Sequence, residues 1–148
     1  MKRVLFLLFG MMVLGACSDD NYTIEDAREN EDIIVKHQTV NFNKISQGAL
    51  EVENVEKIND FINDVEQNHE SSVNISIFNP TGAPFQNTIS YDGKMITFEN
   101  TYGGYPPSPK GTYTCQYISK RGPIVYLESC ESEKGEEFTT MIGLFTKD

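Results

Sequence analysis

The chain has 148 residues, with 12 basic and 22 acidic side chains, three cysteines, two histidines and no tryptophan. This length suits one ordinary domain, because a single core supports about 100–150 residues. The net charge of −10 argues against nucleic-acid binding, since such proteins usually present a basic patch to the phosphates. The odd number of cysteines requires an explanation if the protein is exported.

The N-terminus has the pattern of an export and lipidation signal. Lys2 and Arg3 precede an apolar run over residues 4–13, which is too short to span a bilayer as a helix. Leu14-Gly15-Ala16-Cys17 then matches a bacterial lipobox. We therefore predict a cleaved signal peptide at 1–16, a diacylglycerol on Cys17 and a short tether over 17–22. The alternative is an ordinary signal peptide that a cysteine happens to follow.

Lipidation would fix the location of the mature protein. Cleavage leaves 148 − 16 = 132 residues with a net charge of (12 − 2) − 22 = −12. Two acyl chains suffice for stable anchoring, and an acidic domain is repelled by an anionic lipid surface. We expect a protein held at the extracytoplasmic face of the cell membrane, with no cofactor besides the covalent diacylglycerol.

The first half of the mature chain, which we expect to form one domain over 23–148, contains two helical patterns. Thr23 and Asp26 form a weak capping box for a short helix over 24–30. A β-branched strand follows over 33–40, and then a loop. Over 54–68, apolar side chains recur at three- and four-residue spacing, which predicts an amphipathic helix whose apolar face covers a sheet.

The second half reads as a series of antiparallel strands. Alternating apolar residues and the turn-forming Asp92-Gly93 pair favour strands joined by hairpins. The expected strands cover residues 73–77, 88–91, 94–99, 113–119, 124–130 and 138–145. The order predicts an α+β domain, with a short N-terminal helix and one longer amphipathic helix packed on a mainly antiparallel sheet of about five to seven strands.

Cys115 and Cys130 remain once Cys17 carries lipid. They lie at equal distances from the centre of the second hairpin, between Gly122 and Pro123, and such residues face each other in an antiparallel pair. We predict a disulfide, which is expected outside the cytoplasm. A metal site would need further ligands, and a redox dithiol more often reads Cys-x-x-Cys.

No motif identifies a catalytic or metal site. His37 lies near the first strand without a Gly-x-Ser-x-Gly or His-Glu-x-x-His motif, so we expect a structural or surface role, with catalysis as the alternative. His69 follows the amphipathic helix, where a cation suits the helix dipole. The acidic pairs Asp19-Asp20 and the run Glu29–Asp32 are most simply solvated charge, with weak cation binding as the alternative.

The segment over 102–111 is rich in glycine and proline, which predicts a loop between hairpins. If it recognises a partner, then Tyr102, Tyr105, Pro106 and Pro107 form the contact patch, because aromatic side chains dominate binding hot spots and proline-rich conformers are preformed. In that case both tyrosines should be exposed.

The sequence resembles a family of small Bacillus-type lipoproteins with one C-terminal domain of unknown function. The similar stretches, spread over roughly residues 22–131, are Glu25-Asp26-Ala27, Asn30-Glu31-Asp32-Ile33-Ile34-Val35 with His37, Phe61-Ile62-Asn63-Asp64-Val65, Tyr91-Asp92-Gly93-Lys94-Met95-Ile96, Tyr113-Thr114-Cys115, and Tyr126-Leu127 with Cys130. The resemblance implies a Gram-positive membrane lipoprotein and no particular activity.

We therefore expect an extracytoplasmic binding or interaction module that is not an enzyme. Its partner would be another envelope or secreted protein, and a basic partner is favoured because complementary charge steers association. The first alternative is an inhibitor or immunity lipoprotein acting on a secreted hydrolase or toxin. The second is a carboxylate-dependent hydrolase of cell-wall polymer, which should show a cleft with convergent carboxylates or His37.

Overall fold

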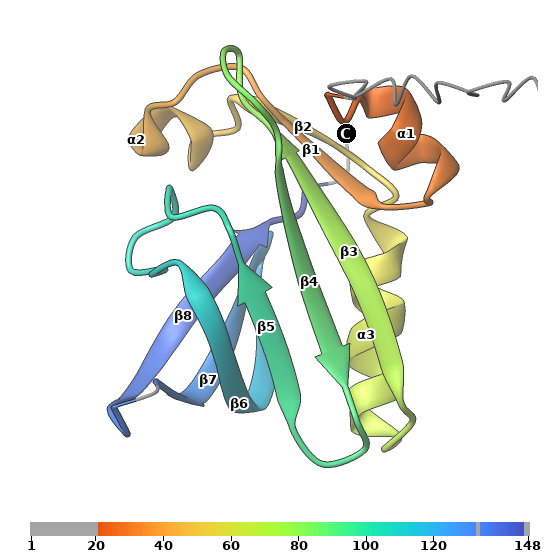
Figure 1. The fold of residues 1–148 in the computed structure, drawn as a ribbon, viewed down its shortest axis with the longest axis vertical. Coiled ribbons are helices and arrows are strands. Elements are labelled where there is room, and N and C mark those ends of the chain that lie inside the picture. Colours follow the sequence, from red (N-terminus) through yellow and green to blue (C-terminus); the bar gives the residue numbers. More distant parts are fainter. Residues whose placement is uncertain (1–20, 133, 147–148) are drawn as a thin grey trace, which may run out of the picture.

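The fold is taken from a computed structural model, which describes residues 21–132 and 134–146. The described residues form one eight-stranded sheet in the order β2-β1-β3-β4-β5-β6-β7-β8. β1 and β3 are parallel, and every other neighbouring pair is antiparallel. The sheet is curled, so that β6–β8 turn away from the plane of β3 and β4, while α3 lies behind β3 (Figure 1).

The helices are α1 (Ile24–Glu29), α2 (Phe42–Ile45) and α3 (Glu56–Glu66). The strands are β1 (Ile33–His37), β2 (Leu50–Glu53), β3 (Ser71–Phe78), β4 (Phe85–Tyr91), β5 (Ile96–Asn100), β6 (Gly111–Arg121), β7 (Ile124–Glu131) and β8 (Glu137–Leu144).

The predicted fold class was wrong. The described chain is mostly β, with helices of 6, 4 and 11 residues beside an eight-stranded mixed sheet. The missed strand, β2, lies at the sheet edge and has one buried side chain, Leu50. Glu51 and Glu53 of β2 instead bind Lys36 of β1 across the strand pair. A short strand with an acidic outer face has no clear apolar alternation, so it reads as loop.

The two longer helices end in the same way. In each, the residue after the C-cap has a positive φ, Glu31 at 57° and Asn68 at 57°. The backbone N–H of the following residue then donates to a carbonyl in the last turn of the helix. In α1 the Asp32 N–H binds the Ala27 carbonyl, and in α3 the His69 N–H binds the Asp64 carbonyl. This is the Schellman arrangement, which satisfies the last carbonyls of a helix. It turns the chain sharply from α1 into β1 and from α3 toward β3.

The core is enclosed by the curled sheet and by α3, which buries Ile58 and Phe61. Isoleucines of β1, β3 and β4 and aromatic side chains of the 102–110 loop lie within the same cluster. In the part of the chain that the structure describes, no helix has the length and hydropathy needed to cross a membrane.

Candidate functional site

The predicted disulfide is confirmed. Cys115 and Cys130 face each other in the β6–β7 pair with Cα atoms 3.9 Å apart, and both side chains are fully buried. The hairpin register is the symmetric one, with Arg121 opposite Ile124. Closing a loop of this length contributes about 3 kcal/mol in the chain-entropy model. The other predicted modification, lipid on Cys17, lies outside the described residues.

The alternative interpretation of the loop as a contact patch, which required both tyrosines to be exposed, was wrong. Tyr102 is 6% exposed and Tyr105 is 1% exposed, and their rings contact each other with centroids 4.8 Å apart. Pro106 and Pro107 do lie at the surface. Gly104 permits this packing, because a Cβ atom there would lie 2.3 Å from the Tyr102 hydroxyl. The loop therefore folds its aromatic side chains inward, and they belong to the core.

His37 lies at the centre of this packing, in what we call the histidine cluster: His37, Asn79, Tyr102 and Tyr105. Its Nδ1 is 2.8 Å from Asn79 Oδ1 and its Nε2 is 2.7 Å from the Tyr105 hydroxyl. Because the Asn79 oxygen only accepts, Nδ1–H donates to it and Nε2 accepts from Tyr105. Burial lowers the pKa of His37, and the Asn79 hydrogen bond partly opposes that shift.

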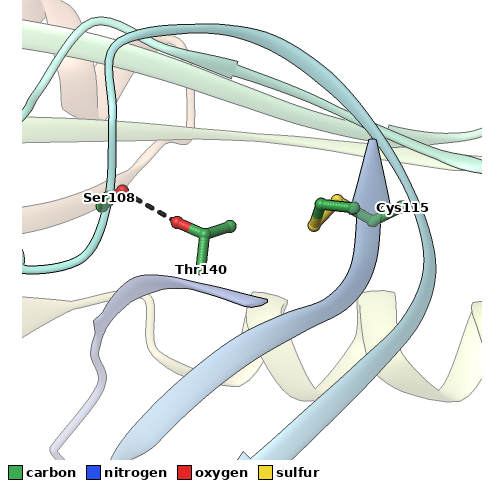
Figure 2. Close-up of a disulfide and its surroundings, with 4 residues drawn as sticks. Ser108, Cys115 and Thr140 are labelled. Carbon is green, nitrogen blue, oxygen red and sulfur yellow. Dashed lines mark hydrogen bonds between the residues drawn. A yellow bond between two sulfur atoms is a disulfide. The ribbon is translucent and has the colours of Figure 1, made fainter. Parts of the chain in front are cut away.

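A second set of buried polar contacts holds the 102–110 loop against the sheet. Asn100 Nδ2 donates to Ser108 Oγ at 3.0 Å and to the Pro109 carbonyl at 2.8 Å. Thr140 of β8 also contacts Ser108, at 3.0 Å between hydroxyl oxygens, close to the disulfide (Figure 2). These contacts join the loop to β5 and β8. The loop and the histidine cluster thus have the properties of a structural element, because His37 and both tyrosines are buried and both ring nitrogens of His37 have partners within the chain.

A different group of residues forms an open polar cleft beside α3, with a volume of about 360 Å³. We call it the Asp32 cleft. Its walls are Asn30–Asp32 after α1, the face of α3 from Lys57 to Asp64, and Ser71–Asn74 at the start of β3. This volume is near the lower end of ligand clefts, which measure about 300–1,000 Å³. The cleft therefore suits a small molecule or a single side chain.

Asp32 is the buried member of this cleft, with 2% of its surface exposed. Its Oδ2 accepts hydrogen bonds from the Tyr22 hydroxyl at 2.5 Å and from Ser76 Oγ at 2.6 Å. Its Oδ1 is buried and has no hydrogen-bond partner among residues 21–132 and 134–146. A buried polar atom without a partner is costly, and more so when it is charged. The carboxylate is thus held through one oxygen, while the other is buried without a partner in the described part of the chain.

The local backbone explains why Asp32 is held so firmly. It follows Glu31 at the Schellman turn of α1 and precedes the buried strand β1. Asn54 Nδ2 donates to its carbonyl oxygen at 2.7 Å. Arg28 of α1 binds Glu53 of β2 through two contacts, at 2.9 Å and 2.8 Å, which joins α1 to the sheet. The position of the carboxylate is therefore set by three elements.

The electrostatics of the cleft are strongly negative. Its acidic residues are Glu31, Asp32, Asp60 and Asp64, and its one basic residue is Lys57, so the formal charge of the lining is −4 + 1 = −3. Lys57 Nζ binds Glu31 Oε2 at 3.0 Å, in a pair whose carboxylate is 78% exposed. The cleft therefore attracts cations. Within the described ranges, however, no three His, Cys, Asp or Glu side chains are arranged to hold a metal ion.

Few features of the sequence indicate this site. Asp32 was expected to be solvated with its acidic neighbours, whereas the structure buries it. The available signal was its position directly before Ile33-Ile34-Val35, because a carboxylate adjoining a fully buried strand must find partners. Weak cation binding at Glu29–Asp32, the alternative to solvated charge, stays untested.

A third region, a second open cleft, has a volume of about 670 Å³ and lies between the 107–113 segment and the start of β8. Pro107, Tyr113 and Phe138 give it a mainly apolar lining, and the Tyr113 and Phe138 rings meet edge to face. Pro107 is the one residue of the expected patch that lines it.

Comparisons of the chain with protein-family models, curated proteins and solved structures gave no match. The resemblance to small Bacillus-type lipoproteins thus stays a prediction.

Proposed function

We propose that the protein is a lipid-anchored extracytoplasmic binding module that holds its ligand in the Asp32 cleft. One observation carries the binding role: Asp32 lines an open, acidic cleft with a buried carboxylate that Tyr22 and Ser76 fix through one oxygen, and its second oxygen has no hydrogen-bond partner among the described residues. Stability of the fold alone does not explain a carboxylate at this position, because an apolar residue would avoid the free-energy cost of burying an unpaired oxygen.

The lipobox supports the location. Cys17 is five residues from Tyr22, and five residues span at most about 18 Å. Because Tyr22 hydrogen-bonds Asp32, a lipid on Cys17 would keep the Asp32 cleft close to the membrane. The ligand would then be a component of the envelope or a partner that approaches the membrane surface.

The anchor is tested on the full chain in a bacterial host. The wild-type protein should incorporate a labelled fatty acid and fractionate with membranes, and Cys17→Ser should lose both properties. Persistent labelling of Cys17→Ser would contradict the anchor.

The binding role is tested by photocrosslinking in intact envelopes. A photoreactive side chain at position 60, in the cleft, should give a discrete product, and the same side chain at position 99, an exposed position of β5, should not. Equal products at both positions would contradict binding in the cleft. Turnover of cell-wall polymer by the purified protein, lost in Asp32→Asn, would favour the hydrolase alternative instead.

A further inference from the structure

We infer that the ligand of the Asp32 cleft is a primary ammonium group, carried by a small amine or by a lysine side chain. This inference rests on the proposed binding function and names the chemistry of its ligand. It starts from Asp32 Oδ1, which is buried and which no described residue contacts by a hydrogen bond. A carboxylate oxygen accepts hydrogen bonds and does not donate, so the missing group is a donor.

The remaining lining indicates that this donor is cationic. Asp64 is half-buried and accepts from Ser71 Oγ at 2.7 Å, while Asp60, one turn earlier on α3, is exposed. The carboxylates thus run from the exposed Asp60 to the buried Asp32. A neutral donor would leave the formal charge of −3 uncompensated, whereas a cation reduces it.

The geometry favours an ammonium group over a metal ion or a guanidinium group. A metal ion needs several ligands at fixed distances, and the described residues contain no such group of side chains. Guanidinium binds best to one carboxylate through two parallel hydrogen bonds. Asp32 offers only Oδ1, because Oδ2 already accepts from Tyr22 and Ser76. An ammonium group has three donors that can reach separate acceptors.

The lining of the Asp32 cleft contains one basic side chain, Lys57. Lys57 binds the exposed Glu31, so it stands beside the cleft rather than on Asp32. An incoming ammonium group would therefore compete with no internal cation for Oδ1.

The test is an NMR titration of the full-length protein in detergent micelles, with n-butylammonium as the probe. We expect saturable shifts of amide signals from residues around Asp32 and Ser71. Asp32→Asn should weaken binding at least tenfold, because it replaces the charged acceptor and keeps the side-chain shape. Glu99→Gln, which removes the same charge from an exposed position of β5, should stay within twofold of wild type.

Comparison with other probes decides the chemistry of the ligand. Tetramethylammonium has the same charge and no donor, so binding as tight as that of n-butylammonium would overturn the inference. So would equal binding of guanidinium or of Ca²⁺, or an equal loss in Glu99→Gln. A lysine derivative blocked at both ends should bind as n-butylammonium does, and failure of both probes would overturn the inference.

A second variant and the crosslinking result distinguish misfolding of Asp32→Asn, or loss of the proposed function, from the absence of an ammonium ligand. If Asp32→Asn does not fold, Asp60→Asn replaces it, with an expected loss of about threefold because that carboxylate is exposed; an unchanged affinity would then refute the inference. A discrete crosslink from position 60 with no amine binding would leave the proposed function standing and would remove the ammonium ligand.

Discussion

Two buried polar clusters lie at opposite ends of β1, where Asp32 precedes its first residue and His37 is its last, and they differ in how their polar groups are satisfied. In the histidine cluster, both ring nitrogens of His37 have partners and the Tyr105 hydroxyl is used. Around Asp32, one carboxylate oxygen has two donors, and the other has none within the described part of the chain. The first cluster is covered by a loop, whereas the second borders an open cleft.

This difference separates a structural cluster from a candidate binding site. Buried polar groups normally find partners within the protein, and each exception requires an explanation. Asn87 Nδ2, near the loop, is also buried without a partner in the described chain. It belongs to a neutral amide whose oxygen accepts from the Thr101 backbone at 2.7 Å, so its desolvation costs less than that of a carboxylate.

The largest expected effect is on the histidine cluster. Tyr105→Ala should lower the free energy of unfolding by about 4 kcal/mol, the usual cost of removing a fully buried aromatic side chain. Tyr105→Phe removes only the hydroxyl and should cost about 1–2 kcal/mol, because His37 Nε2 loses its donor. Urea unfolding measures both.

Tyr117→Ala is the matched control, because Tyr117 is 60% exposed, and it should change stability by less than about 0.5 kcal/mol. If Tyr105→Ala costs no more than this control, the loop is not part of the core. The histidine cluster would then not be a structural cluster of the core.

The disulfide gives the next largest effect. Replacing both Cys115 and Cys130 by alanine should cost about 3 kcal/mol, and a reducing agent should destabilise the wild type and leave the double variant unchanged. Because β4 and β5 separate β6 from the strands of the Asp32 cleft, the variant should keep its amine affinity. A wild type whose stability is insensitive to reductant would contradict the disulfide. A loss of amine affinity in the double variant would show that the β6–β7 hairpin and the Asp32 cleft are coupled.

The sequence predicted local features well where one signal dominates. The capping box of Thr23 and Asp26 is present at α1, and the symmetric spacing of Cys115 and Cys130 correctly gave the β6–β7 register. Both depend on residues that are close in the chain or related by a single turn. Such interactions are visible as spacing.

The sheet edge and the burial of the loop were not predictable in the same way. β2 pairs with β1 through residues whose side chains are charged, so its apolar pattern is weak. The inward turn of Tyr105 depends on His37, which is 68 residues away in the sequence. Asp32 depends likewise on Ser76, 44 residues away. Long-range partners decide whether a tyrosine or an aspartate is buried, and composition does not report them.

A pH titration of stability tests the histidine cluster more finely. Because burial lowers the pKa of His37, the unfolded chain binds its proton more readily than the folded one. Stability should therefore fall as the pH drops below about 6.5, the ordinary histidine value, until the folded pKa is reached. Each unit of difference contributes about 1.4 kcal/mol. Urea unfolding of wild type and His37→Gln between pH 4.5 and 8 isolates this slope as their difference.

The control for that titration is His69→Gln, which removes an exposed imidazole and should keep the slope that depends on His37. Carboxylates contribute to all three proteins and cancel in the differences. A His37→Gln curve parallel to that of the wild type would mean that His37 titrates alike in the folded and unfolded chain. The covered character of the histidine cluster would then be wrong.

The smallest expected effect lies at the wall of the Asp32 cleft. Glu31 has a φ of 57° at the position after the C-cap of α1, where a Cβ atom costs about 1–2 kcal/mol and glycine is favoured. Glycine loses about 0.5–1 kcal/mol through the entropy of the unfolded chain. The exposed pair with Lys57 contributes less than about 1 kcal/mol. Glu31→Gly should therefore raise the free energy of unfolding by at most about 1.5 kcal/mol.

Asn68→Gly is the matched variant at the corresponding position after α3, which also has a φ of 57°. Asparagine tolerates this conformation better than glutamate, and Asn68 Oδ1 accepts a hydrogen bond from the Tyr91 hydroxyl at 3.2 Å. Asn68→Gly should thus be neutral or destabilising. If Glu31→Gly is stabilising while Asn68→Gly is not, a glutamate at the cleft wall is retained at a cost to the fold, as expected where a residue serves binding rather than stability. If both variants destabilise equally, Glu31 is an ordinary helix terminus. Asp32 is then the one residue that distinguishes the Asp32 cleft, as a binding site, from the structural 102–110 loop.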